Sequence, residues 1–170
     1  MHHLHTEFQI VPLADAVTTI PLLKRLFIEE WGPYYGPAGP GDAEKDLHEC
    51  CNRDDLPIAL VALDDDGTVL GTAALKKESV GSELGLGPWL AAFLVPIEHR
   101  KRGIGSALVE AIENKARNFG IQSIFVSTDA AANIVRRRGW TLLESPAESL
   151  RGPVAVYKLR LSANASMAPL

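Results

Sequence analysis

The feature that most constrains this chain is an apolar strand-like segment, followed by a basic turn and a long amphipathic helix. Residues 89–95 are almost all apolar, which is typical of a central strand covered on both faces. From Gly103 to Phe119, apolar side chains recur every three or four residues, and Gly120 follows as a helix stop. A strand buried on both faces needs helices to cover it, so the segment predicts an α/β fold.

Alternation and turn signals along the rest of the chain fill in the other elements. Strands are expected at residues 8–11, 58–63, 69–75, 121–126, 140–143 and 154–159. Helices are expected from Thr18 or Thr19 to about Trp31, from Asp42 through Cys51, and over residues 130–138. The proline and glycine density of residues 32–41 predicts a loop without regular structure. This order predicts one three-layer α/β domain with a mixed central sheet over residues 1–161, and a frayed tail over 162–170.

Composition narrows the class of protein. The chain has 170 residues, of which 46% are hydrophobic, enough to build a core without disulfides or structural metals. The longest uncharged run, residues 84–97, is shorter than the ~20 residues of a membrane helix. Cys50 and Cys51 are adjacent, which is a poor geometry for a disulfide, and no signal peptide is recognisable at the N-terminus. We therefore expect a cytoplasmic protein with no membrane partner.

Charge is distributed unevenly along the sequence. Residues 1–70 hold 4 basic and 13 acidic side chains, whereas residues 71–170 hold 13 basic and 8 acidic ones. The asymmetry is either chance on a solvated surface or a sign that the C-terminal part meets an anion and the N-terminal part a cation. No long basic stripe with interleaved aromatic residues appears, so nucleic acid is not an expected partner.

The turn before the long helix carries two glycines and three basic residues. The first turn of a helix presents unpaired backbone N–H groups and a partial positive charge, which suits a pyrophosphate. The alternative is a tight turn whose glycines serve geometry alone. A P-loop does not fit, because the chain has no Gly-Lys pair, and a Rossmann fingerprint would need a third glycine where Leu108 stands. The residues in question are Arg100, Lys101, Arg102, Gly103 and Gly105.

This pattern resembles the GNAT N-acetyltransferase superfamily, whose acetyl-CoA motif reads Arg/Gln-x-x-Gly-x-Gly/Ala after a strand ending in Val-x-Pro. The chain has Val95-x-Pro and then Arg100-x-x-Gly103-x-Gly105, and Gly139-Trp140 matches the family's later Gly-Phe/Trp. The resemblance covers about residues 58–159, and the first two helices by order only. It implies a three-layer GNAT-like fold and an enzyme that transfers an acetyl group from acetyl-CoA to a primary amine, without a metal.

The resemblance also implies where coenzyme A binds. Backbone amides from the basic turn through the first helical turn would hold the pyrophosphate, and the preceding strand would pair with the pantetheine arm. The Val95 amide would stabilise the thioester oxyanion, and Thr128 stands where the family often has an Asn that contacts pantetheine. The implied contacts are Phe93, Val95, Arg100, Lys101, Arg102, Gly103, Ile104, Gly105, Ser106 and Thr128.

Two positions depart from the family pattern and leave the catalytic residues unassigned. Val135 stands where the family often has a Tyr general acid, and Leu90-Ala91-Ala92 stands where a carboxylate base is frequent. Solvent is one replacement, and the candidate side chains are Glu29, Glu30, Tyr35, His48 and Glu83. The alternative function is a catalytically weak or inactive module that senses acyl-CoA.

The aromatic segment between the first two helices is the candidate acceptor site. Trp31, Tyr34 and Tyr35 lie where the family binds its acceptor, and such rings either sandwich a substrate or cation or simply cap the core. Together with the acidic N-terminal half, they favour a cationic small-molecule or peptide amine. His48 and Cys51 lie one helical turn apart, but two ligands do not make a metal site. The oligomeric state stays open, a homodimer included.

Overall fold

The computed structural model describes residues 7–162 and is organised around one mixed sheet of seven strands, in the order β1-β2-β3-β4-β5-β9-β6. Only β4 and β5 run parallel, and every other neighbouring pair is antiparallel. A separate hairpin, β7–β8, follows β6. The strands are β1 (Phe8–Pro12), β2 (Ile58–Asp64), β3 (Val69–Lys76), β4 (Trp89–Leu94), β5 (Ser123–Ser127), β6 (Thr141–Leu142), β7 (Ala147–Ser149), β8 (Gly152–Val154) and β9 (Val156–Arg160).

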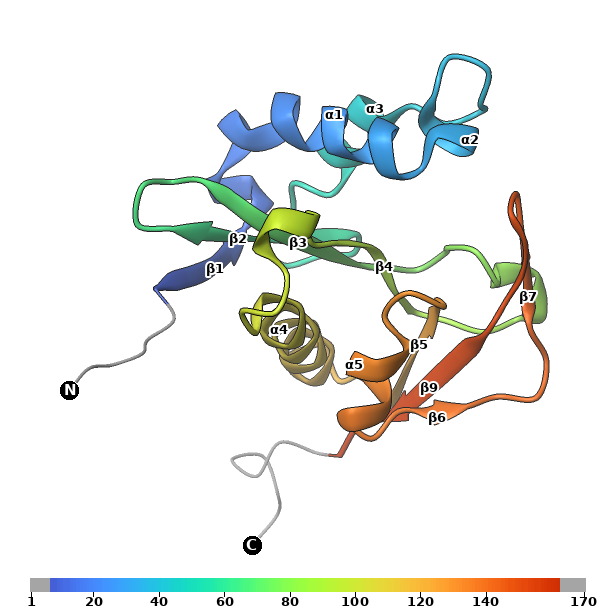
Figure 1. Ribbon diagram of the computed structural model, residues 1–170. Coiled ribbons are helices and arrows are strands. Elements are labelled where there is room, and N and C mark those ends of the chain that lie inside the picture. The colour runs from blue at the N-terminus through green and yellow to red at the C-terminus, as the bar shows by residue number, and fades with distance from the viewer. Residues whose placement is uncertain (1–6, 163–170) are drawn as a thin grey trace, which may run out of the picture.

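Helices cover both faces of this sheet, which confirms the three-layer α/β prediction (Figure 1). On one face lie α1 (Ile20–Glu30), α2 (Gly32–Tyr35) and α3 (Ala43–Glu49), and on the other lie α4 (Ile104–Asn118) and α5 (Ala132–Arg137). Short 3-10 turns span Leu13–Asp15, Val17–Thr19, Ser82–Leu84 and Ile97–His99. No helix within residues 7–162 is long and apolar enough to cross a membrane.

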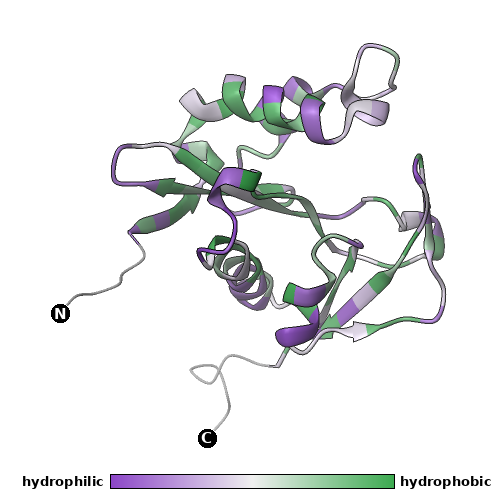
Figure 2. Ribbon diagram, viewed as in Figure 1, coloured by the Kyte–Doolittle hydropathy of each residue, from purple (hydrophilic) through white to green (hydrophobic). Residues whose placement is uncertain are grey.

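The two cores follow from the alternation of side chains along the strands. On β2, Leu60 packs toward α4 while the next residue, Val61, packs toward α1 and α3. The central strands are accordingly apolar along most of their length, while α1 and α4 carry both apolar and hydrophilic sides (Figure 2). A third, smaller cluster forms around Trp89 and Phe125 and includes Ala147 of the hairpin. This third cluster anchors the base of β7–β8 to the sheet.

The expected elements are present with their ends displaced by a few residues, but the structure corrects three details. Residues 32–41 are not wholly irregular, because α2 forms one helical turn in which Pro33 occupies an N-terminal position that needs no N–H. Thr19 does not cap α1 with its hydroxyl, which instead donates to the Ala16 carbonyl at 2.6 Å. The β7–β8 hairpin was not expected. Of the tail predicted over 162–170, only Ser162 lies within the described residues.

Glu113 of α4 lies outside the apolar stripe of that helix in the sequence, yet the structure buries it. It is 2% exposed, and its carboxylate accepts two hydrogen bonds from Arg138, at 2.9 and 2.8 Å. The Trp140 indole N–H donates a third at 3.0 Å. Burial is tolerated because the charge is paired and its oxygens are satisfied, so this carboxylate ties α4 to the end of α5. The Glu113 pairing raises the pKa of Arg138 and keeps it protonated.

Candidate active site

β4 is the strand on which the candidate site is built, because it parts from its parallel neighbour. The ladder between β4 and β5 consists of the single pair Trp89 with Phe125. Beyond that pair, β4 keeps its partner β3 on one side only. Ala92 has φ +50°, and the β3–β4 register shifts between Thr72 and Ala74, so β4 carries a bulge there. The edge of β4 toward β5 therefore offers backbone groups to an extended ligand.

The turn between β4 and α4 forms a concave run of backbone N–H groups. Lys101 and Gly103 have φ values of +64° and +81°, whereas Arg102 between them does not have a positive φ. Within residues 7–162, the N–H groups of residues 101–106 donate to no acceptor, and the first bonded amide is that of Ala107, to the Gly103 carbonyl at 3.1 Å. Alternating left- and right-handed residues at a helix N-terminus make an anion-binding nest.

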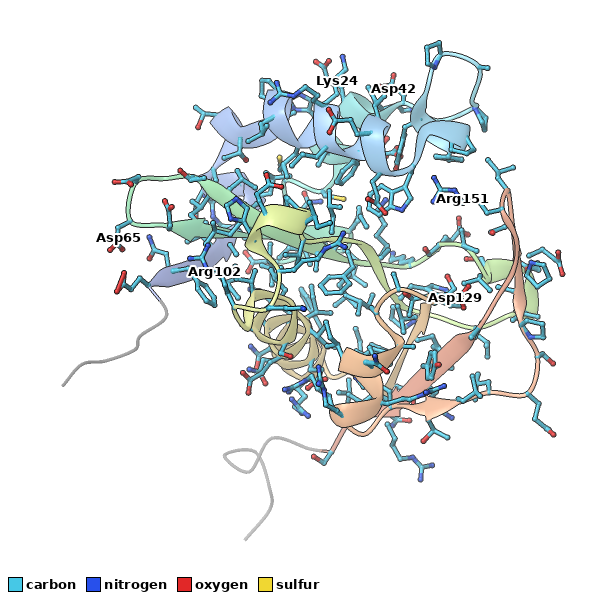
Figure 3. The ribbon with its side chains drawn as sticks, in the orientation of Figure 1. Lys24, Asp42, Asp65, Arg102, Asp129 and Arg151 are labelled. Atoms are coloured by element: carbon cyan, nitrogen blue, oxygen red, sulfur yellow. The ribbon has the colours of Figure 1, made fainter. Side chains whose placement is uncertain are left out.

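The basic side chains of this turn have distinct partners. The Arg100 Nε donates to the Val95 carbonyl at 2.8 Å, so this guanidinium braces the turn against the end of β4. The Arg102 Nη1 lies 3.3 Å from the His99 Nδ1 (Figure 3 shows Arg102 above the start of α4). Lys101 is exposed. All three charges stay next to the N–H nest, but Arg100 has a bracing role that its position in the sequence did not reveal.

The two glycines of the motif do different things. A Cβ on Gly103 would meet no atom within 4 Å, and its positive φ is required by the turn. Gly105 is buried inside α4, where a Cβ would lie 2.9 Å from the Ile134 Cδ1 and 3.2 Å from the Phe93 Cζ. Gly103 thus shapes the nest, while Gly105 allows α4, α5 and β4 to approach one another closely.

Thr128 and Val135 lie on the segment that leaves β5. The Thr128 hydroxyl accepts from the Ala131 N–H at 3.0 Å, and its own N–H donates to the Ala155 carbonyl at 2.9 Å. Thr128 is half-buried, and its hydrogen bonds organise the chain at the entry to α5. Val135 is fully buried in the core beneath α4. No titratable group stands at the Val135 position, where a general acid is frequent in the resembled family.

The three aromatic residues expected to bind the acceptor form a cluster with Phe27. The ring of Trp31 lies 5.0 Å, and that of Tyr35 5.6 Å, from the ring of Phe27. The Tyr35 hydroxyl donates to Asp46 at 2.7 Å, and burial, followed by this hydrogen bond, raises the pKa of Tyr35 above its ordinary range. Tyr34 is 42% exposed at the outer edge of the cluster. Trp31 and Tyr35 are thus both partly buried in the cluster, and Tyr34 is the ring exposed to solvent.

Of the side chains considered as proton carriers, Tyr35 and Glu83 have hydrogen-bond partners of their own. The Glu83 carboxylate accepts the Glu148 N–H at 3.2 Å; its own backbone N–H and that of Glu148 lower the pKa of this carboxyl. His48 is exposed and lies 4.0 Å from Glu44. Within residues 7–162, no three His, Cys, Asp or Glu side chains come together as a metal site would require.

The β7–β8 hairpin brings in a residue that sequence reasoning missed. The Arg151 Nη2 donates to the Glu30 carbonyl at 2.7 Å, joining residues 121 positions apart. Figure 3 shows the Arg151 side chain pointing from the hairpin tip toward the junction of α1 and α2. A basic residue next to a glycine in a turn carries no sequence signal of so distant a contact.

Comparison with known proteins identifies the family of this chain. Among curated proteins, the amino-acid acetyltransferase of Pseudomonas syringae pv. syringae is 40% identical over 75 residues, which is 44% of this chain but 16% of that relative's length. Aminoglycoside 6'-acetyltransferase type Ii, at 19% identity, superposes with a TM-score of 0.69 and covers 92% of this chain and 99% of its own. A GNAT phosphinothricin acetyltransferase of Sinorhizobium meliloti, solved with acetyl-CoA, superposes with a TM-score of 0.70 at 19% identity. That match covers 97% of this chain and 94% of the other. Residues 22–140 match the model of the acetyltransferase (GNAT) family, and the chain therefore belongs to that family.

Proposed function

We propose that the chain is an N-acetyltransferase that moves the acetyl group of acetyl-CoA to a primary amine. The observation that carries the proposal is the run of N–H groups at residues 101–106, which lies at the end of a strand whose edge toward β5 is largely unpaired. A pyrophosphate and an extended amide-containing arm need these two features side by side. The family match over residues 22–140 and the neighbours solved with coenzyme A support the same reading.

The residues present fit coenzyme A on steric and electrostatic grounds. Open space around the Gly103 Cα leaves room for a phosphate against the backbone, and Arg100, Lys101 and Arg102 supply three positive charges beside it. The backbone of Phe93 and Val95 would pair with the pantetheine arm where β4 has left β5. The same assignment gives Ile104, Gly105 and Ser106 to the pyrophosphate and places Thr128 near the pantetheine.

The reaction is proposed as a direct attack within a ternary complex. The amine nitrogen forms a bond to the thioester carbonyl carbon, the carbon–sulfur bond breaks, and the sulfur leaves as a thiolate. The Val95 N–H would stabilise the oxyanion that develops on the carbonyl oxygen. The amine loses its proton to water, because Ala91, Ala92 and Val135 offer no proton carrier. The protein then contributes chiefly by holding the two reactants in place.

For the acceptor, we propose a cationic amine. Residues 1–70, which include the Trp31 and Tyr34 segment, carry nine more acidic than basic side chains, as the 13 acidic and 4 basic residues show. Aromatic faces next to acidic groups attract cations. Structural relatives include aminoglycoside acetyltransferases, and a curated relative is named for amino acids, so the names of relatives do not select between cationic and zwitterionic acceptors.

The test is an acetylation assay on spermidine, kanamycin and a lysine peptide, with glutamate and glucosamine 6-phosphate as anionic controls. Each amine is measured at low and at physiological salt, where the Debye length is about 8 Å. We expect turnover only with the cationic amines, and an acceptor KM that rises with salt. A preference for the anionic amines would overturn the acceptor class.

The same assay separates the enzyme from the alternative, a module that binds acyl-CoA without catalysis. That alternative is favoured because the two positions that usually handle protons in the family are aliphatic here, at Ala91–Ala92 and at Val135. Tight calorimetric binding of acetyl-CoA together with no thiol release on any amine would support the module. Thiol release with at least one amine of the panel would exclude it.

A further inference from the structure

The β7–β8 hairpin is anchored at its base and nearly unsupported at its tip. At the base, Ala147 is fully buried against Trp89 and Phe125, and the Glu148 N–H donates to the Glu83 carboxylate. At the tip, Leu150 is 63% exposed. Within residues 7–162, one hydrogen bond joins the hairpin to the N-terminal helices, from Arg151 to the Glu30 carbonyl. Among hydrogen bonds of the described residues, the tip's position opposite α1 therefore depends on the Arg151 side chain.

The turn at the tip holds Arg151 in place. The Ser149 hydroxyl donates to the Gly152 carbonyl at 2.7 Å and accepts from the Arg151 N–H at 3.1 Å. Gly152 adopts φ +101°, which closes the turn tightly. A turn fixed in this way orders the backbone of Arg151, so that only its side-chain torsions remain to be fixed by the contact.

The receiving group is the C-terminal end of α1. Glu30 is the last residue of that helix, and its carbonyl accepts no other hydrogen bond from the described residues. Helix C-termini carry a partial negative charge, and basic side chains commonly satisfy their last carbonyls. The next residue is Trp31, the first of the candidate acceptor residues, and α2 with Tyr34 follows at once. The contact thus joins the hairpin tip to the segment proposed to bind the acceptor.

The face of the sheet that carries this contact has two separate apolar clusters. One lies under α1 and α3 and includes Ala92 of β4, and the other surrounds Trp89 and Phe125 under the hairpin. The Arg151–Glu30 hydrogen bond connects the hairpin, which lies over one cluster, to α1, which lies over the other. Figure 1 shows the hairpin tip extending toward the α2 end of the N-terminal helices. From this arrangement we infer that Arg151 is a latch that holds the β7–β8 hairpin against α1 and so limits the size of the acceptor. The inference rests on the proposed acetyltransferase function.

The test compares Arg151→Met, Arg151→Lys and a matched control, Arg25→Met. Met keeps much of the length and loses the donor, Lys keeps a donor and the charge, and Arg25 is an exposed arginine on α1 itself. We expect Arg151→Met to raise the KM of the best cationic amine about three- to tenfold, as loss of one charge-assisted hydrogen bond would. Turnover and the calorimetric affinity for acetyl-CoA should stay within about twofold, and Arg151→Lys should recover part of the acceptor KM.

Size selectivity gives the second readout. With the latch removed, kanamycin should lose less kcat/KM than spermidine, because a wider opening favours the bulkier amine. Equal KM values in Arg151→Met and Arg25→Met would overturn the latch. A loss of acetyl-CoA affinity as large as the rise in acceptor KM would also overturn it, because that pattern indicates general loosening of the fold.

A third measurement does not depend on turnover. Hydrogen exchange of the peptide covering residues 144–156 should accelerate in Arg151→Met and not in Arg25→Met, with or without coenzyme A. Absence of acetylation in the wild-type protein would contradict the proposed function, while unchanged exchange of this peptide would contradict the latch. The two failures are therefore distinguishable.

Discussion

β4 separates two regions that the chain builds by different means. On the α4 side, an anion site is made of consecutive backbone N–H groups over residues 101–106, within one turn and one helix start. On the α1 side, the candidate acceptor surface is made of aromatic side chains, and Arg151 of the hairpin reaches the Glu30 carbonyl beside them from 121 positions away in the sequence. The backbone site tolerates many side chains but few conformations, whereas the acceptor surface can change with single side chains. Such a division would suit an enzyme whose acetyl donor is constant and whose amine acceptor can vary.

The largest effect is expected from a substitution that blocks the backbone N–H site. Gly103→Glu places a carboxylate in the open space beside the N–H nest, where it competes with the pyrophosphate. We expect a loss of acetyl-CoA affinity of about 100-fold or more, since two charge-assisted hydrogen bonds lost at ~1.5 kcal/mol each have that effect. Calorimetric titration measures it.

A matched control stands at the other end of the same helix. Gly120 has φ +75°, and a Cβ there also meets no atom within 4 Å, so Gly120→Glu imposes similar backbone strain without approaching the nest. Its melting temperature should fall as far as that of Gly103→Glu, with acetyl-CoA affinity kept. Gly105→Glu is a poorer probe, because its side chain would displace Ile134 and Phe93. Similar affinity losses at Gly103 and Gly120 would show that strain alone is responsible.

The second effect, smaller, addresses the acceptor side. Trp31→Ala should raise the acceptor KM roughly tenfold, because it removes an aromatic face that would contact the cationic acceptor. Acetyl-CoA affinity should be nearly unchanged, because the nest shares no residue with this cluster. Phe27→Leu is the control: Phe27 is 3% exposed in the same cluster, so its loss should lower the melting temperature and leave the acceptor KM in place. Steady-state kinetics with both substrates varied measures the two KM values separately. A rise in the KM of acetyl-CoA in Trp31→Ala would contradict the prediction.

This contrast also explains which parts of the molecule the sequence could predict. The three layers, α4 and the Gly103 turn depend on local periodicity and on conformations that few residues adopt, so local patterns predict them. Glu113 and the hairpin depend on partners far along the chain: the carboxylate is buried because Arg138 and Trp140 reach it. Likewise, Tyr35 belongs to the packed cluster because its hydroxyl meets Asp46. Spacing along one helix or loop contains no information about such partners.

The third effect tests how far the nest relies on side chains. Arg100→Ala removes both a positive charge and the bond from Nε to the Val95 carbonyl. We expect acetyl-CoA affinity to fall about three- to tenfold, well short of the glycine variant, because the backbone donors remain. Arg100→Lys restores the charge but not the planar donor, so it should recover the salt dependence of binding and only part of the affinity. Full recovery by Lys would mean that the brace contributes nothing.

The smallest expected effect concerns proton transfer at Glu83. Backbone N–H groups, its own first and that of Glu148 second, lower the pKa of this carboxyl below its ordinary value of about 4.3. A carboxyl with a lowered pKa stabilises the fold above the unfolded-state pKa, and that contribution is lost only as the pH falls through the folded-state pKa. Glu83 is therefore ionised throughout the neutral range and has little tendency to take a proton from an ammonium group. Glu83→Gln keeps an oxygen acceptor for the Glu148 N–H and should leave the profile of kcat/KM against pH unchanged between about pH 6 and 9. If the wild-type profile shows a limb in that range and the Gln variant loses it, Glu83 is the base, and water is not the proton acceptor on the α1 side of β4.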